Sequence, residues 1–175
     1  MHSHVVKIGI FGPTLRLSPL RNGDTATVAA LFERLGDASR RTRFLGAKPR
    51  LTRTELEQLA AEDCRRHAVV AYVDGDPRPA GIARFVRDGD SAEVAFAVAD
   101  SHQGERIGTT LATELLRDAR AAGIGSITAT VDSSNGAALS LRSGSRGVTS
   151  SAPTGRGAER ASGQSRPEAS GRAGT

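Results

Sequence analysis

Residues 92–109 read AEVAFAVADSHQGERIGT, and the other elements of the domain can be assigned outward from this segment. Large apolar side chains alternate with alanine from Val94 to Val98, which is the period-two pattern of a half-buried strand. A polar, glycine-containing segment follows from Gln103 to Thr109 and leads into an apolar stripe with helical spacing. The segment therefore predicts a strand, a tight loop and the first turn of a helix in direct succession.

Turn signals and hydrophobic periodicity divide the rest of the chain into further elements. They give the order strand, helix, helix, three strands, helix, strand. This order predicts an α/β domain with a mixed, mostly antiparallel sheet and flanking helices. The expected elements are the strand Leu15–Leu20, helices that begin at Asp24 and Thr52 with a helical turn from Ser39 to Phe44 between them, the strands His67–Val73, Pro79–Arg87 and Ala92–Val98, the helix Gly108–Ala122 and the strand Ser126–Val131.

The composition changes abruptly at Arg142. Residues 142–175 contain seven Gly, seven Ser and six Arg but no Leu, Ile, Phe, Met or Tyr. Such a segment lacks the apolar side chains that would offset the entropy of ordering, so we expect a disordered tail. The chain then consists of an N-terminal extension (residues 1–13), one domain (residues 14–141) and this tail (residues 142–175).

Most of the net charge also belongs to the tail. The chain carries a formal charge of +5, and the tail, with six Arg against two Glu, supplies +4 of it. A domain of nearly balanced charge lacks the composition of a nucleic-acid-binding protein, so we do not expect nucleic acid as a partner. An Arg/Gly/Ser arm that binds RNA or DNA is the alternative interpretation of the tail.

Cysteine content and apolar runs exclude other classes of protein. Cys64 is the only cysteine, which excludes an intrachain disulfide and a cysteine-built zinc site. The longest apolar runs have the length of a strand, and the N-terminus lacks the apolar core of a signal peptide. We expect a cytoplasmic protein with no membrane partner and no metal, for which a homodimer is one option.

The loop from Gln103 to Thr109 is the main candidate for a ligand site. A glycine-containing turn at a helix N-terminus presents unpaired N–H groups and the positive end of the helix dipole, which favour an anion such as a pyrophosphate. The alternative is a tight turn that binds nothing. Neither the Gly-Lys-Ser/Thr of a Walker P-loop nor the Gly-x-Gly-x-x-Gly of a dinucleotide site is present here.

The segment 92–109 resembles the GNAT superfamily of acetyl-CoA-dependent N-acetyltransferases. Gln103, Ile107 and Gly108 match the family motif Gln/Arg-x-x-Gly-x-Gly/Ala, whereas Arg106 stands where the motif has Gly. The resemblance runs from Leu15 to about Leu141. Residues 32–35, 39–44 and 56–59 are similar to the bacterial protein-lysine acetyltransferase type.

The resemblance implies an activity and a set of residues. Acetyl-CoA would be the cosubstrate, and a primary amine of a small molecule or a protein lysine would attack its thioester directly. A backbone N–H, that of Val98, would stabilise the oxyanion. The residues implied to bind the cofactor are Phe96, Ala97, Val98, Gln103, Gly104, Glu105, Arg106, Ile107, Gly108, Thr109 and Asn135.

Glu93 is the candidate general base. We expect its side chain on the same strand face as Ala95 and Ala97, whose small size leaves room for a substrate. A carboxylate at that place can take the proton of an ammonium group, directly or through water. The alternative is a solvent-exposed charge that pairs with Arg84 or Arg87 on the neighbouring strand.

The end of the domain departs from the family. The helix expected to begin at Asn135 would carry a Tyr that protonates the leaving thiolate, but the chain has no Tyr after Tyr72. Residues 142–175 also lack the apolar side chains for two last strands. We therefore expect a C-terminally truncated domain with an open sheet edge. A remnant that binds an acyl-CoA or a partner chain without turnover is the alternative to an active N-acetyltransferase.

Overall fold

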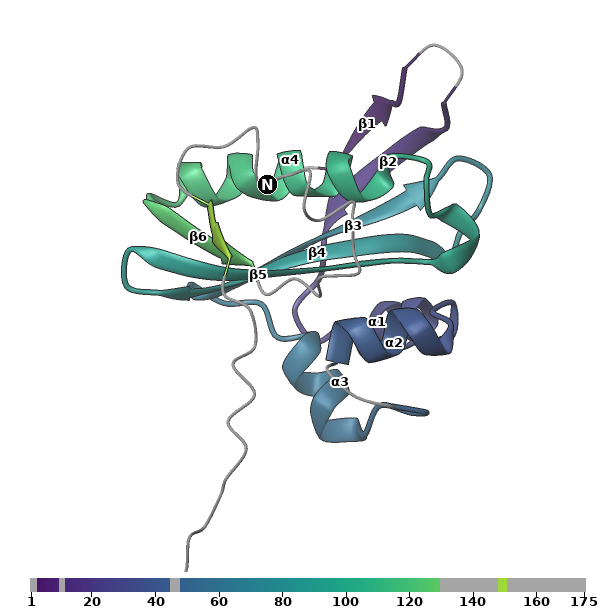
Figure 1. Ribbon diagram of the computed structural model, residues 1–175, viewed down its shortest axis with the longest axis horizontal. Helices are drawn as coiled ribbons and strands as arrows, with labels where there is room; N and C mark the ends of the chain where they lie inside the picture. The colour runs from purple at the N-terminus through teal and green to yellow at the C-terminus, as the bar shows by residue number, and fades with distance from the viewer. Residues whose placement is uncertain (1–2, 10–11, 45–47, 130–147, 151–175) are drawn as a thin grey trace, which may run out of the picture.

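A computed structural model of the chain describes residues 3–9, 12–44, 48–129 and 148–150. They form one seven-stranded sheet in the order β1 to β7, antiparallel from β1 to β5 and parallel from β5 to β7 (Figure 1). The elements are β1 (His4–Lys7), β2 (Thr14–Pro19), α1 (Thr25–Glu33), α2 (Asp37–Phe44), α3 (Arg53–Leu59), β3 (Arg66–Val73), β4 (Pro79–Asp88), β5 (Ser91–Val98), the 3₁₀ helix η1 (Asp100–His102), α4 (Ile107–Ala121), β6 (Ser126–Ala129) and β7 (Val148–Ser150). The predicted fold class is confirmed.

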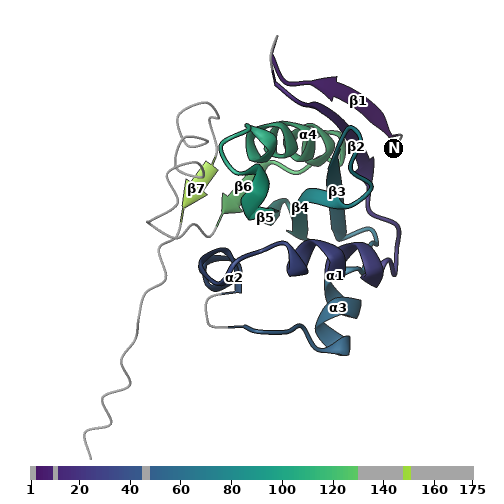
Figure 2. The ribbon, with the colours of Figure 1, turned by 90° about the vertical axis from the view of Figure 1, so that its right-hand side faces the viewer.

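Helices cover both faces of the sheet. Helix α4 packs against β3, β4 and β5 on one face, whereas α1 packs against β4 and α2 against β5 on the other, with α3 against α1 (Figures 1 and 2). Two apolar cores result, one between α4 and the sheet and one between the sheet and the first three helices. Leu111 and Leu115 of α4 and Leu15 and Leu17 of β2 are among the fully buried side chains of the first core.

Side-chain caps determine where α1 and α3 begin. Asp24 Oδ1 accepts a hydrogen bond from Thr27 N at 3.0 Å, which satisfies one of the free N–H groups at the start of α1. Thr52 and Glu55 form the predicted capping box at the start of α3. At the other end of α3, Arg84 Nη1 donates to Leu59 O at 3.1 Å, so a residue of β4 ties this helix to the sheet.

Both edges of the sheet differ from the expectation. Strand β1 lies in residues 1–13, where no strand was predicted, and pairs with β2 from His4 to Lys7. A run of only four residues is too short for periodicity to reveal it, and its pairing depends on β2 rather than on its own composition. Strand β7 lies in the segment predicted to be a disordered tail, and it pairs with β6 (Figure 2). Val148 and Thr149 are β-branched, so local strand propensity supports this pairing.

Candidate functional site

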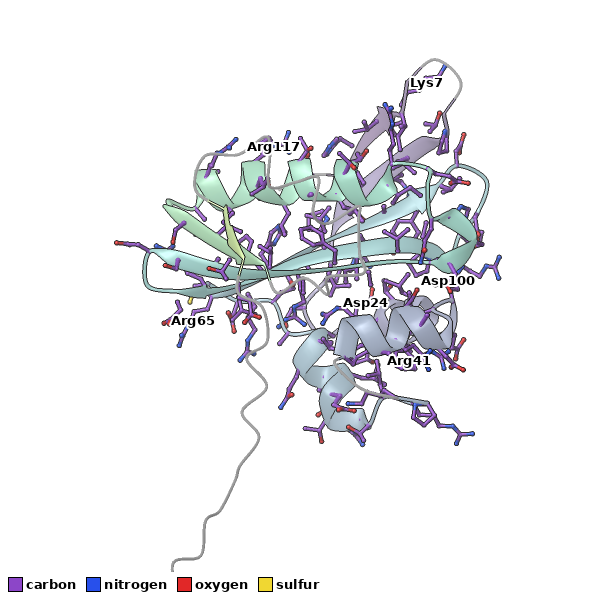
Figure 3. All side chains as sticks on the ribbon, viewed as in Figure 1. Lys7, Asp24, Arg41, Arg65, Asp100 and Arg117 are labelled. Atoms are coloured by element: carbon purple, nitrogen blue, oxygen red, sulfur yellow. The ribbon has the colours of Figure 1, made fainter. Side chains whose placement is uncertain are left out.

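The junction between β5 and α4 forms the predicted succession of strand, loop and helix. Strand β5 ends at Val98, η1 follows at Asp100, which is labelled in Figure 3, and α4 begins at Ile107. The first N–H to be bonded within α4 is that of Thr110, which donates to Arg106 O at 3.0 Å. The N–H groups before it therefore project from the helix end, where the helix dipole adds partial positive charge.

Arg106 adopts a left-handed backbone conformation at the start of α4. Its φ and ψ angles are 62° and 12°, and it is the one non-glycine residue with positive φ in the described part of the chain. Glycine enters this region without a steric penalty, which gives a physical reason for the Gly of the motif at this position. The chain keeps the same kind of turn with an arginine, at a conformational cost.

Gly108 and Val98 bring the helix end and the strand end together. A Cβ atom built on Gly108 would lie 3.6 Å from Val98 Cγ2, and no other described atom outside the local chain would lie within 4 Å of it. The surface above Gly108 is thus open to a ligand. Glycine leaves room at this helix end that a larger side chain would fill, so the residues present fit the pyrophosphate of a CoA.

Backbone N–H groups at the end of β5 alternate between two directions. Ala99 N donates to Ala80 O at 2.8 Å, which directs the N–H of Ala99 and, by alternation, that of Ala97 toward β4. The N–H groups of Phe96 and Val98 therefore face the side of β6. In the described residues β6 pairs with β5 only as far as Val94, opposite Ala129.

Glu93 lies on β5 opposite Val86 and is exposed. The register also sets Ala95 opposite Arg84, so Glu93, Ala95 and Arg84 share the sheet face on which α2 packs. Five residues separate Glu93 from Val98, or roughly 16 Å along a strand. A thioester held at the Val98 N–H would be too far for direct proton transfer or for transfer through one water, so a proton could reach Glu93 only along a chain of several waters.

The side chains of the loop hold its shape. Gln103 Nε2 donates to Ser39 Oγ at 3.0 Å and to Asp100 Oδ1 at 3.2 Å, which connects the loop to α2. Glu105 Oε2 lies 3.0 Å from His102 Nδ1. The side chains of Gln103 and Glu105 therefore already have partners within the protein. The backbone N–H groups after Gln103 are the better candidates to contact an anion. Asn135 lies outside the described residues.

A family model described as the acetyltransferase (GNAT) family matches residues 31–142, which include this junction. The chain belongs to the GNAT family. Its predicted membership is thereby confirmed.

Three similar proteins match between 62% and 81% of this chain. A curated acetyltransferase of Pseudomonas aeruginosa is 32% identical over 114 residues, so the match spans 62% of this chain and only 61% of that relative. The solved GNAT domain of S. lividans PAT superposes with a TM-score of 0.72 at 26% identity, covering 81% of this chain and 85% of that one. A cAMP-binding acyltransferase from Mycobacterium smegmatis superposes with a TM-score of 0.56 at 27% identity, covering 81% and 42%.

Two arginines near the strand of Glu93, Arg43 and Arg84, were given no role in the reaction by sequence reasoning. Burial and the charge of Arg84 lower the pKa of Arg43 to about 10, and the opposite charge of Glu93 acts against them. Arg84 is only 7% exposed, and burial lowers its pKa too. The sequence shows that residues 40, 41 and 43 are arginines, but it does not show which of their side chains turns inward.

His67, the second residue of β3, has two acidic partners. Its Nδ1 lies 3.2 Å from Glu62 Oε2, and its Nε2 lies 3.1 Å from Asp118 Oδ2 on α4. This contact explains how α4 can bury Asp118, which is 7% exposed. The cluster joins α4 to β3 on the far side of the sheet from Glu93, and it is structural.

The structure describes residues 3–9, 12–44, 48–129 and 148–150, and these ranges contain neither a metal-binding cluster nor a membrane-spanning helix. Within them, no three His, Cys, Asp or Glu side chains are grouped so as to hold a metal ion. No helix in these ranges has the length and apolar character to cross a bilayer.

Proposed function

We propose that this protein transfers the acetyl group of acetyl-CoA to a primary amine by direct attack. One observation carries the proposal: Gly108, in the first turn of α4, lies beside Val98 at the end of β5, since a Cβ built on it would be 3.6 Å from Val98 Cγ2. GNAT membership supports acyl transfer, and the acetyltransferase name of the Pseudomonas aeruginosa relative supports the acetyl group. The amine acceptor and the cytoplasmic location remain part of this proposal.

The chain's own groups divide the work as follows. Backbone N–H groups from residues 104–109 bind the pyrophosphate, since that of Gln103 already donates to Asp100 O at 3.3 Å, and those of Phe96 and Val98 face the acyl arm. Asn135, which the structure does not describe, stays a predicted cofactor contact. The amine nitrogen forms a bond to the carbonyl carbon while the carbon–sulfur bond breaks. The proton of the amine passes through water to Glu93, and the sulfur leaves as thiolate.

A pair of variants at Gly108 tests the cofactor site. Gly108→Val should weaken CoA binding at least tenfold, about 1.4 kcal/mol, because its branched side chain occupies the open surface above the N–H groups. Gly108→Ala is the matched control, since its Cβ makes only an ordinary contact with Val98, at 3.6 Å. Calorimetric titration with CoA measures both, and far-UV circular dichroism checks that α4 persists. Equal affinity of parent and valine variant would remove the pyrophosphate assignment.

Glu93→Gln tests the chemical step. The amide keeps the size of the side chain but does not accept a proton, so turnover should fall roughly 10²-fold while CoA affinity stays the same. Thiol release with an amine panel measures turnover. Undiminished turnover would exclude Glu93 as the base. A parent that binds CoA but releases no thiol with any amine would favour the alternative, an inactive acyl-CoA-binding remnant.

A further inference from the structure

Helix α2 has little apolar surface with which to pack. Phe44 is its one large apolar side chain, and none of its described side chains is fully buried. The Phe44 ring meets the ring of Phe32 in α1 with 5.5 Å between their centroids, and the Arg40 guanidinium lies 4.5 Å from the centroid of the same Phe32 ring. A helix of eight residues is not stable in water on its own, so the position of α2 depends strongly on each contact with its neighbours.

The loop before α4 supplies one of these contacts through the side chain of Gln103. Its Nε2 donates to Ser39 Oγ of α2 at 3.0 Å and to Asp100 Oδ1 of η1 at 3.2 Å. Because a carboxylate only accepts hydrogen bonds, the nitrogen and not the oxygen of the amide must face Asp100. The two hydrogens of one amide group thus serve two elements, and Gln103 forms a bridge from η1 to α2.

The Asp100 end of this bridge is firmly attached to the rest of the fold. Asp100 N donates to Arg34 O at the end of α1 at 3.2 Å. A Cβ atom on Gly36 would overlap Asp100 Oδ2, so the Asp100 side chain packs closely against the α1–α2 connection. Arg34 Nη1 in turn donates to Pro79 O at the start of β4 at 3.1 Å. The Ser39 end lies on a helix with little apolar packing, so the bridge has more effect on α2 than on η1.

The position of α2 matters for the acceptor. Helix α2 packs against β5, whose residues Glu93, Ala95 and Ala97 share one sheet face by alternation. In the proposed reaction the amine lies on this face and its proton moves toward Glu93. A shift of α2 therefore changes the space that is open to the acceptor.

We propose that Gln103 is a positioning residue for the acetyl transfer, because its side chain holds α2 in a fixed place relative to the loop that binds CoA. The inference rests on the proposed function and adds a residue that acts through Ser39 and Asp100. CoA bound at residues 104–109 restricts the loop, and the bridge passes this restriction to α2. Coupling between binding events is reciprocal, so the attachment of α2 also strengthens CoA binding.

Hydrogen exchange of α2, followed by mass spectrometry, measures this coupling without turnover. In the parent, saturating CoA should slow the exchange of the amides of residues 40–44 by about threefold or more. Gln103→Met keeps the length of the side chain but has no donor, so CoA should change this exchange by less than about 1.5-fold. Gln103→Arg should restore the slowing, because a guanidinium can donate to both the hydroxyl and the carboxylate. Slowing that persists in Gln103→Met would overturn the proposal.

A double-mutant cycle separates the bridge from a direct contact between Gln103 and CoA. Ser39→Ala removes the acceptor on α2 and should weaken CoA binding about threefold, and Gln103→Met should weaken it by at least as much. Both changes remove the same bond, so the double variant should bind CoA as Gln103→Met does. If Ser39→Ala binds CoA like the parent, or if the two losses multiply, the bridge is refuted.

Ser126→Ala is the matched control. Ser126 Oγ donates to Ser91 Oγ at 2.8 Å where β5 and β6 begin, so this variant loses one exposed hydrogen bond between side chains, outside α2 and the CoA loop. Its CoA affinity and the slowing of α2 exchange should match those of the parent. An equal loss in Ser126→Ala and Ser39→Ala would mean that any lost surface hydrogen bond loosens α2, and it would overturn the specific role of Gln103.

Turnover distinguishes a positioning role from a merely structural one. With the best amine of the panel, Ser39→Ala should raise KM for the acceptor about threefold or more while kcat stays within about twofold of the parent value. An unchanged KM would overturn the positioning role. A parent that binds CoA and slows α2 exchange but acetylates no amine would overturn the proposed acetyl transfer and leave the coupling of the loop to α2 intact.

Discussion

Replacement of Arg106 by glycine should make the protein more stable. The residue has a φ of 62° and a ψ of 12° at the start of α4, a conformation that costs an L-residue roughly 1–2 kcal/mol. Glycine avoids this penalty but loses roughly 0.5–1 kcal/mol more backbone entropy on folding. The difference predicts a gain of about 0.5–1 kcal/mol in the free energy of unfolding. For a chain of this size, that gain corresponds to a rise in Tm of about 1–4 °C.

The control for this prediction is Arg106→Ala. Both variants lose the exposed guanidinium, whereas only glycine removes the Cβ that makes the left-handed conformation unfavourable. The difference between the two in urea unfolding, at equal m-values, therefore measures the relief of backbone strain less the larger entropy that glycine loses on folding. If Arg106→Gly were no more stable than Arg106→Ala, the left-handed turn would carry no penalty, and our physical reason for the glycine of the motif would be wrong.

Two further predictions concern His67 and Gly36. Burial, the largest influence, lowers the pKa of His67, but hydrogen bonds with Glu62 and Asp118 outweigh it and raise the pKa above its ordinary value. The cluster should therefore stabilise the fold fully below about pH 6.5 and lose its effect as pH rises through the folded pKa. The stability difference between parent and His67→Gln in urea unfolding should shrink from about pH 6 to about pH 9, and a constant difference would refute it. Gly36→Ala places a Cβ against Asp100 Oδ2, and the exposed Asp100 side chain must turn away from Gln103, so the free energy of unfolding should change by about 0.5 kcal/mol or less while CoA binding weakens. The control Gly125→Ala meets only Asp90 O at 3.7 Å, and calorimetry that finds equal CoA affinity for the two variants would contradict this.

Local sequence was sufficient for most elements of the domain. The apolar alternation around Phe96 predicted β5, and the Thr52 capping box predicted the start of α3. The turns at Gly75 and Gly89 were also predictable, and both glycines have positive φ. These features depend on a few adjacent residues, so their physical cause is contained in the sequence itself.

The candidate site was predictable only in part. The loop residues Gln103 to Gly108 could be found because a helix N-terminus after a glycine-containing turn has a local pattern. Glu93 could be placed on a face by alternation, but its arginine neighbours could not, since Arg43 comes from α2 and is fifty residues away in the chain. Its inward direction depends on how α2 packs against β5.

The sequence by itself determined the order of the helices and strands from β2 to β6, the two apolar faces and the position of the turn before α4, because each follows from spacing within one segment. Only the tertiary structure decided which charges meet. The bond from buried Arg84 to Gln58 of α3, the contact of His67 with Asp118 and the bond from Gln103 to Ser39 join residues between 26 and 64 positions apart. Electrostatic interactions act through space and depend on solvent exposure, so their strength is set by packing and not by the order of residues along the chain.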